Sequence, residues 1–267
     1  MSANPKEEVL SSESVKLPLP HEFNPNYSDE RRIDYTNTET NIDESTIADM
    51  KAIMARYPQP RSALLPMLHL VQSVDGYISA AGVELCADLL GIPVAQVNGV
   101  ATFYTQYHRK PAGEYHVGVC TTSLCAIMGG DVLLGQMEQK LGIEPGETTP
   151  DGKFSLERVE CNAACDFAPV MMVNWEFMDA MTPELADKLI DDLRAGRDVH
   201  STRGPRIPTF KENERMLAGF CDGLADEGPS AGDASLRGVK LAKENGWRAP
   251  SAAEVAAAKP ADEEAAK

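Results

Sequence analysis

The sequence has 267 residues, a length that suits one or two domains, and 43% of them are hydrophobic, which is enough for a buried core. The formal net charge is −16, with 41 acidic residues. This charge argues against nucleic-acid binding, which needs a basic surface, and against unaided docking on an anionic membrane. Because no segment approaches the roughly 20 apolar residues that span a bilayer, and no signal peptide is visible, we expect no direct membrane insertion.

Residues 1–40 are polar, contain several prolines and show little apolar periodicity, so they are predicted to form an extended N-terminal arm. From Asp43 onward, apolar residues recur at spacings of three and four, which indicates amphipathic helices. The predicted helix starts lie near Asp43, Ser62, Ser79 and Pro93. Residues 41–110 are therefore predicted to form a small helical bundle.

The residue pattern changes at residue 111, where alternating apolar residues begin to indicate strands. Strands are predicted over 114–120, 154–160, 170–174 and 176–181, and helices over 123–142 and 182–196. The second helix has a strong start in Thr182, Pro183 and Glu184, a capping hydroxyl followed by a proline and an acid. Residues 111–203 are therefore predicted to form a small sheet covered by helices, and the whole chain is predicted to have an α+β fold.

Residues 204–267 are rich in alanine, glycine and charged residues, and they predict an acidic, largely irregular C-terminal extension. The segment 235–250 differs, because Leu236, Val239, Leu241 and Trp247 offer apolar surface for burial. Two interpretations remain open for it: a peptide that docks on a partner, or a tail that touches nothing.

Four of the six cysteines form two close pairs. Cys120 and Cys125 are separated by four residues, and Cys161 and Cys165 by three. The first pair lies where a predicted strand ends and a helix begins, and the second lies in a loop between two predicted strands. Because no export signal points to an oxidising compartment, clustered cysteines favour metal binding over structural disulfides.

The spacing favours iron–sulfur chemistry among the metals that thiolates select. Structural zinc sites usually use pairs spaced by two to four residues, so the four-residue gap suits zinc only marginally. The cysteine runs of four-iron and plant-type ferredoxins are absent, and two separate pairs, one for each iron, fit a [2Fe–2S] cluster. Zinc and a disulfide remain as alternatives at this point.

The remaining cysteines and the histidines have simpler interpretations. Cys86 lies on the apolar face of a predicted helix and is expected to be a core residue, whereas Cys221 is expected to be a free thiol. His69 and His116 are expected to be packing or surface residues. His108 is expected at the junction between the bundle and the sheet, not as a ligand.

Two stretches, VCTTSLC and VECNAACDFAPVMMVN, resemble the thioredoxin-like [2Fe–2S] ferredoxin family. Two more, RSALLPMLHLVQSVDGYIS and VNGVATFYTQYHRKPAGEYHVGVC, are similar to the N-terminal bundle of the members that belong to respiratory NADH–quinone oxidoreductase, complex I. The resemblance covers about residues 40–200. One departure is Ala163, which stands where the family often has glycine.

The resemblance implies a helical bundle followed by a thioredoxin-like [2Fe–2S] domain over 111–203. It also implies one [2Fe–2S] cluster held by Cys120, Cys125, Cys161 and Cys165, with no catalytic side chain on this chain. The chain alone would be an electron carrier, and an enzyme only as a subunit of the complex.

The partners implied are the subunit that binds FMN and NADH, with which the cluster would exchange single electrons, and neighbouring iron–sulfur subunits. The location implied is the cytoplasmic side of the inner membrane, peripheral and held through other subunits. Two alternatives remain: the equivalent subunit of a soluble NAD-dependent hydrogenase or formate dehydrogenase, and a non-redox zinc-binding module.

Overall fold

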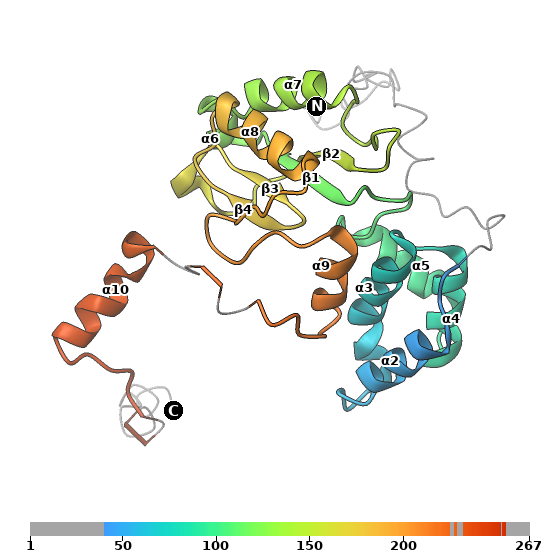
Figure 1. The fold of residues 1–267 in the computed structure, drawn as a ribbon. Coiled ribbons are helices and arrows are strands. Elements are labelled where there is room, and N and C mark those ends of the chain that lie inside the picture. The colour runs from blue at the N-terminus through green and yellow to red at the C-terminus, as the bar shows by residue number, and fades with distance from the viewer. Residues whose placement is uncertain (1–39, 225–226, 229–231, 252, 255–267) are drawn as a thin grey trace, which may run out of the picture.

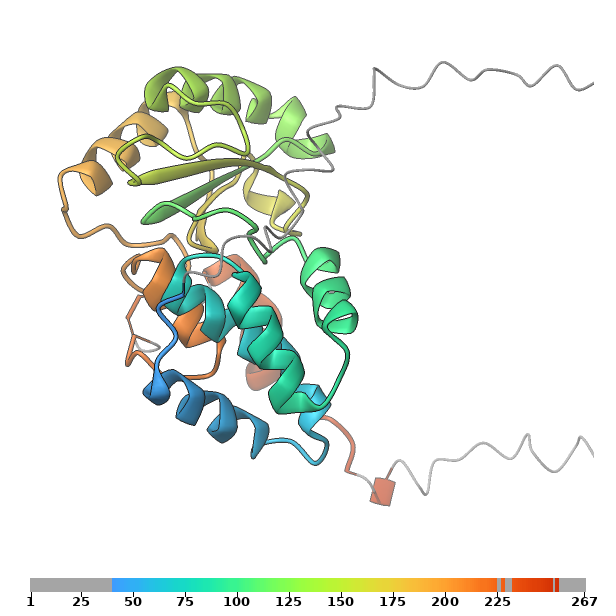
Figure 2. The same ribbon diagram turned by 90° about the vertical axis from the view of Figure 1, so that its right-hand side faces the viewer.

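The computed structural model describes residues 40–224, 227–228, 232–251 and 253–254 (Figure 1). The predicted N-terminal arm lies outside the described residues except for residue 40, as does the segment 255–267. A helical part and a sheet with its covering helices lie side by side in both ribbon views (Figures 1 and 2).

The helical part contains α2 (Glu44–Met54), α3 (Leu64–Asp75), α4 (Ala80–Leu90) and α5 (Val94–Phe103). Asp43 caps α2 by accepting a hydrogen bond from the backbone of Thr46 at 2.8 Å, and Ser79 caps α4 in the same way. Ser62 does not cap α3, because the 3₁₀ turn η1 (Pro60–Ala63) precedes that helix. The bundle core includes the fully buried side chains of Met50, Ile53, Met67, Leu68, Val71, Val83 and Val97.

The sheet contains β1 (Tyr115–Cys120), β2 (Phe154–Val159), β3 (Met171–Val173) and β4 (Glu176–Met178), in the order β2-β1-β3-β4. The β1–β2 pair is parallel, and the other two pairs are antiparallel. Helices α7 (Gly130–Leu141) and α8 (Pro183–Arg194) cover one face and share its apolar core with alternate residues of β1 and β2 (Figure 2). The remaining residues of these strands, including His116 and Cys120, face the other side.

The predicted helix over 123–142 is wrong in one respect, because the structure divides it in two. A short helix, α6 (Ser123–Ile127), is followed by a break, and α7 begins at Gly130. Gly129 has φ +107° at this break, a backbone conformation that glycine adopts readily and other residues avoid. The break at Gly129 separates α7 from α6, the short helix that carries Cys125.

The segment that follows residue 204 also differs from the prediction of an irregular extension. Helix α9 (Phe210–Leu217) packs against α3, at the boundary between the bundle and the sheet (Figure 1). Its Glu214 side chain is fully buried and accepts hydrogen bonds from His69 of α3 at 2.7 Å, Gln72 of α3 at 2.9 Å and Trp175 of the β3–β4 turn at 3.1 Å. This carboxylate therefore joins three elements that are distant in the sequence.

Helix α10 (Asp233–Glu244) contains most of the apolar residues of the segment 235–250, which was expected either to dock on a partner or to touch nothing. Leu236, Val239, Leu241 and, just beyond the helix, Trp247 are all exposed. Within the described ranges, no helix has both the length and the apolar character needed to cross a membrane.

Replacing Glu214 with alanine should destabilise the fold by about 3 kcal/mol, because it leaves the buried donors of His69 and Gln72 and the half-buried donor of Trp175 without their acceptor. Urea unfolding of the variant at neutral pH measures this loss. The exposed helical residue Glu84 provides the control, since Glu84→Ala should change the free energy of unfolding by less than about 0.5 kcal/mol. Equal effects of the two substitutions would contradict the role assigned to Glu214.

Candidate metal centre

The four cysteines of the two pairs meet at one end of the sheet. Cys120 ends β1, Cys125 lies in α6, Cys161 follows β2, and Cys165 begins the 3₁₀ turn η2 (Cys165–Phe167). The sulfur atoms of Cys161 and Cys165 lie 3.4 Å apart. Cys120 and Cys125 are buried together with Val170 and with Ala164, the neighbour of Cys165, so the first pair packs against the loop that carries the second.

Parallel pairing of β1 with β2 brings the pairs together. In this register Cys120 lies opposite Val159, so both strands end at the same edge of the sheet and Cys161 follows two residues later. The start of the β3 segment is joined to the same point, because the Cys120 amide donates to the Val170 carbonyl at 3.1 Å. The Ala168–Pro169 peptide bond that leads into β3 is cis.

Glycine at position 130 allows the backbone of α7 to approach the first cysteine pair. A Cβ atom there would lie 2.4 Å from the carbonyl oxygen of Cys120 and 2.9 Å from that of Cys125. Real Cβ atoms do not come so close to backbone atoms, so any larger residue would push the helix away. The small size of Gly130 therefore helps to place Cys120 beside Cys125.

Ala163, which departs from the family pattern, has φ +56°. This is the left-handed region, where glycine is free of the steric penalty that alanine meets. The loop thus keeps the conformation for which glycine is suited, at a cost of about 1 kcal/mol. Its backbone N–H donates to the Cys161 sulfur at 3.4 Å, so the strained residue contributes directly to the centre.

The thiols affect one another electrostatically. Burial, together with the neighbouring Cys120, raises the pKa of Cys125 to about 11, although a hydrogen bond from the Val170 backbone acts in the opposite direction. The pKa of Cys165 is raised by its hydrogen bond with Cys161, by burial and by the charges of Cys161 and Cys120. A metal that binds these sulfurs must displace their protons and relieve their mutual repulsion.

Arg203 lies near the centre, although no local motif in the sequence marks it. Its guanidinium group donates to Asp179 at 2.7 and 2.9 Å and lies 3.7 Å from Asp166, the neighbour of Cys165. The same group lies over the Phe167 ring at 5.2 Å. Arg203 therefore holds the η2 turn in place and sets a positive charge beside it.

The other two cysteines lie apart from the centre. Cys86 is fully buried in the bundle core, as predicted, and burial raises its pKa to about 12. Cys221 is exposed beyond α9. The chemistry of the converging set, four sulfur donors on two short pairs, fits zinc or an iron–sulfur cluster.

Comparison with known proteins places the chain in a family. The family model for the thioredoxin-like [2Fe–2S] ferredoxin matches residues 50–194. The predicted α+β fold, with helices preceding a ferredoxin domain of this kind, is confirmed by this match and by the observed helices and four-stranded sheet.

Curated relatives cover most of the chain. A subunit of the NADH-quinone oxidoreductase of Mycobacterium tuberculosis is 51% identical over 203 residues, which are 76% of this chain and 81% of that protein. The NADH-quinone oxidoreductase subunit 2 of Thermus thermophilus is 38% identical over 159 residues, 58% of this chain and 88% of that protein. Among solved structures, a chain of an NAD⁺-reducing [NiFe]-hydrogenase matches 49% of this chain and 22% of its own length, with a TM-score of 0.46 and 22% identity.

Replacing Gly130 with alanine should displace α7 and separate Cys120 from Cys125, so the purified chain should retain less than half of its normal metal. Gly135 provides a matched control in the same helix, because a Cβ there meets nothing within 4 Å. Gly135→Ala should keep the full metal content and raise stability by about 0.5–1 kcal/mol. Metal analysis and thermal unfolding measure both effects. Full metal retention by Gly130→Ala would refute the close-approach argument.

Proposed function

The chain belongs to the thioredoxin-like [2Fe–2S] ferredoxin family, and from this premise we propose that it is an electron-transfer subunit of respiratory NADH–quinone oxidoreductase. The observation that carries this proposal is the convergence of four cysteine sulfurs at one edge of the sheet, in a chain 51% identical to a subunit of such a complex. The chain is an enzyme component only within that complex, and alone it is an electron carrier.

Cys120, Cys125, Cys161 and Cys165 are the proposed ligands of one [2Fe–2S] cluster. The cluster supplies one-electron redox chemistry when bound. The protein provides the two sulfur pairs and the N–H donors from Ala163 and Val170, which stabilise negative charge on sulfur. It also provides an apolar wall that limits the approach of water to the first pair.

The four cysteines differ in exposure, so the centre has a buried side and an open side. Cys120 and Cys125 are each 2% exposed, whereas Cys161 is exposed and Cys165 is intermediate. The loop of the second pair is therefore the more open side of the centre, whereas protein atoms cover the first pair.

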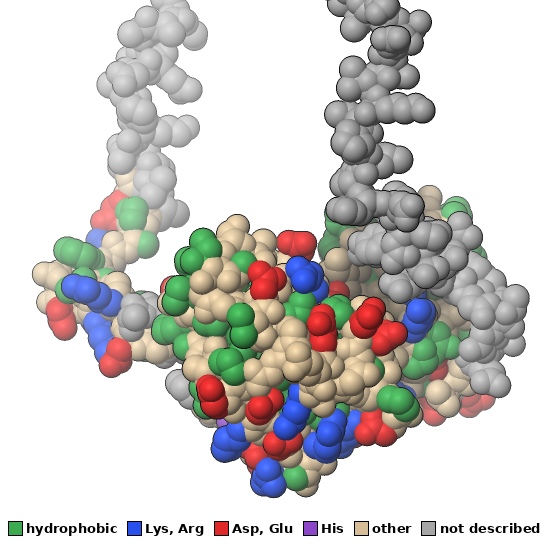
Figure 3. Space-filling model, turned by 90° about the horizontal axis from the view of Figure 1, so that it is seen from above, with side chains coloured by type: hydrophobic (Ala, Val, Ile, Leu, Met, Phe, Trp, Pro, Cys, Tyr) green, Lys and Arg blue, Asp and Glu red, His purple; other side chains and the backbone are tan. Residues whose placement is uncertain are grey.

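An apolar surface lies directly beside this centre. We call it the α6 surface, and it comprises the exposed side chains of Leu124, Ile127, Met128 and Val132. In the view from above, hydrophobic side chains gather on the side of the molecule where α6 lies (Figure 3). Ile127 is 81% exposed, an exposure that favours burial by a partner protein in an assembly.

The occupant we propose for the α6 surface is the subunit that binds FMN and NADH, with which the cluster exchanges single electrons. The position of the surface next to the cysteines supports this choice, since a partner seated there lies within reach of the centre. Neighbouring iron–sulfur subunits complete the assembly. The proposed location is peripheral, on the cytoplasmic side of the inner membrane, with attachment through these subunits.

Replacing Cys161 with serine should weaken or alter the electron paramagnetic resonance signal of the dithionite-reduced chain, because it removes a proposed ligand. Cys86→Ser should leave that signal intact, since Cys86 lies in the bundle core away from the centre. The reverse pattern, with the signal lost in Cys86→Ser and kept in Cys161→Ser, would refute the ligand assignment.

Purification of the tagged chain from its native membranes tests the proposed membership of the complex. The chain should be recovered with a flavin-containing partner, and NADH should reduce its cluster in the purified assembly. Ile127→Glu should lower recovery of the flavin at least about tenfold, because it places a charge in the proposed interface. The matched control is Leu185→Glu, on the exposed side of α8, which should leave the recovery of the flavin unchanged. Recovery without flavin from the unmodified chain would overturn the proposal.

A further inference from the structure

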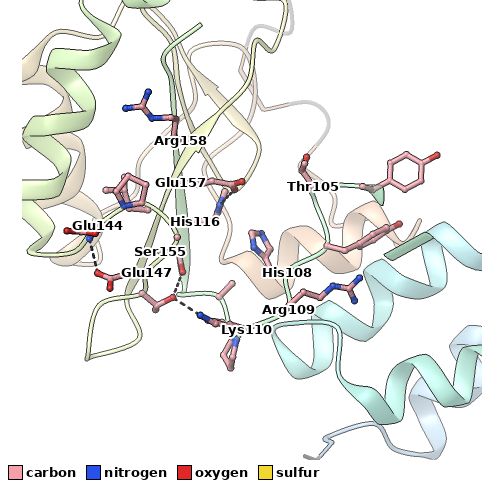
Figure 4. Close-up of a pocket in the computed structure, with 18 of the residues that line it drawn as sticks. Thr105, His108, Arg109, Lys110, His116, Glu144, Glu147, Ser155, Glu157 and Arg158 are labelled. Carbon is pink, nitrogen blue, oxygen red and sulfur yellow. Dashed lines mark hydrogen bonds and ion pairs between the residues drawn. The ribbon is translucent and has the colours of Figure 1, made fainter. Parts of the chain in front are cut away.

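A cavity of about 570 Å³ lies where the bundle meets the sheet, and none of the four cysteines of the centre lines it, although its lining extends to Glu160, next to Cys161. It is bounded by the segment that follows α5, by residues of β1 and β2 on the face opposite α7 and α8, and by the 144–148 loop. Three of its lining side chains, His108, His116 and Glu157, point toward one another from these separate segments (Figure 4).

The potential ligand atoms of these three residues form a compact group. One ring nitrogen of each histidine and a carboxylate oxygen of Glu157 all lie within 4.8 Å of one another. His116 Nε2 lies 2.7 Å from the Glu157 carboxylate, and the His108 and His116 ring centroids are 4.8 Å apart. Parallel pairing sets His116 on β1 and Glu157 on β2 on the same face of the sheet.

The two histidines carry buried nitrogen atoms that the fold does not satisfy. His108 Nε2 and His116 Nδ1 have no hydrogen-bond partner among the described residues. Buried polar atoms almost always have a partner, so two orphan nitrogens in one cluster point to a ligand. Burial, together with the nearby His116, lowers the pKa of His108 to about 3, which keeps this ring neutral and its lone pair available at neutral pH.

The backbone around His108 is held firmly, which makes the group preorganised. The His108 amide donates to the Gln72 side chain at 2.6 Å, and its carbonyl accepts from the Ile78 amide at 2.8 Å. The His108 ring also packs against Phe210 of α9 and Trp175, with centroid distances of 5.4 and 6.2 Å. A ligand would therefore meet donors that are already in place.

We propose that His108, His116 and Glu157 bind a divalent transition metal such as Zn²⁺. Two imidazoles and one carboxylate suit such ions, whereas Mg²⁺ and Ca²⁺ prefer oxygen donors alone. Three protein ligands leave a coordination position that opens toward the cavity, where water can enter. The metal would connect the bundle, through His108, to β1 and β2 of the sheet.

The test is a calorimetric titration of the full-length, cluster-loaded chain with ZnCl₂, in which the cysteines are already occupied. The unmodified chain should bind one zinc ion. Glu157→Gln should weaken binding at least about tenfold, because it removes the charged ligand while keeping its shape. Glu144→Gln removes the same charge from the rim of the same cavity and should leave the affinity within about twofold.

X-ray absorption of the zinc-loaded chain separates this site from the cysteine centre. The expected spectrum has nitrogen and oxygen neighbours at about 2.0 Å, and the iron and sulfide content should stay unchanged. The proposal is overturned if the unmodified chain binds no zinc, if Glu157→Gln binds as tightly as the unmodified chain, or if sulfur neighbours appear at about 2.3 Å.

Discussion

Parallel pairing between β1 and β2 is the constraint on which the rest of the structure depends. Its register places Cys120 opposite Val159, so two cysteine pairs about 40 positions apart in the chain meet at one edge of the sheet. The same register sets His116 and Glu157 on one face, at positions that precede Cys120 and Val159 in the same strands. One pairing therefore positions both the proposed cluster and the second group of ligand-type side chains.

The bundle and the sheet are joined through buried polar contacts. Glu214 of α9 connects α3 with the β3–β4 turn, and Asn213 beside it donates to the Asn174 carbonyl at 2.7 Å. The Asn174 side chain in turn accepts from the His116 amide at 2.7 Å. Because a buried polar group is costly unless it is paired, this network specifies one arrangement of the two parts.

Local sequence signals predicted much of the fold and the cysteine centre. Apolar patterning and turn residues such as Pro169 located all four strands, and the Asp43, Ser79 and Thr182 caps located three helix starts, since these signals depend only on near neighbours. The two cysteine pairs were equally visible, because their spacing is short. Their meeting point follows once the strands are paired.

Other features depend largely on tertiary contacts. Helix α9 has one local start signal, the Thr209–Glu212 capping box, from which no helix was predicted, but two of its three buried residues, Asn213 and Glu214, are of types usually exposed, so the sequence indicated an irregular tail. The break at Gly129 was hidden because isolated glycines also occur inside helices. His108, His116 and Glu157 come from three segments, and each alone has an ordinary packing interpretation.

The central claim is that the four converging cysteines hold a [2Fe–2S] cluster. Metal and sulfide analysis of the intact chain, combined with electron paramagnetic resonance after dithionite reduction, tests it most directly. We expect a cluster's full complement of iron and inorganic sulfide in every chain, and a rhombic S = 1/2 signal that integrates to about one spin. A chain with stoichiometric zinc at the cysteines, no sulfide and no signal would contradict the claim.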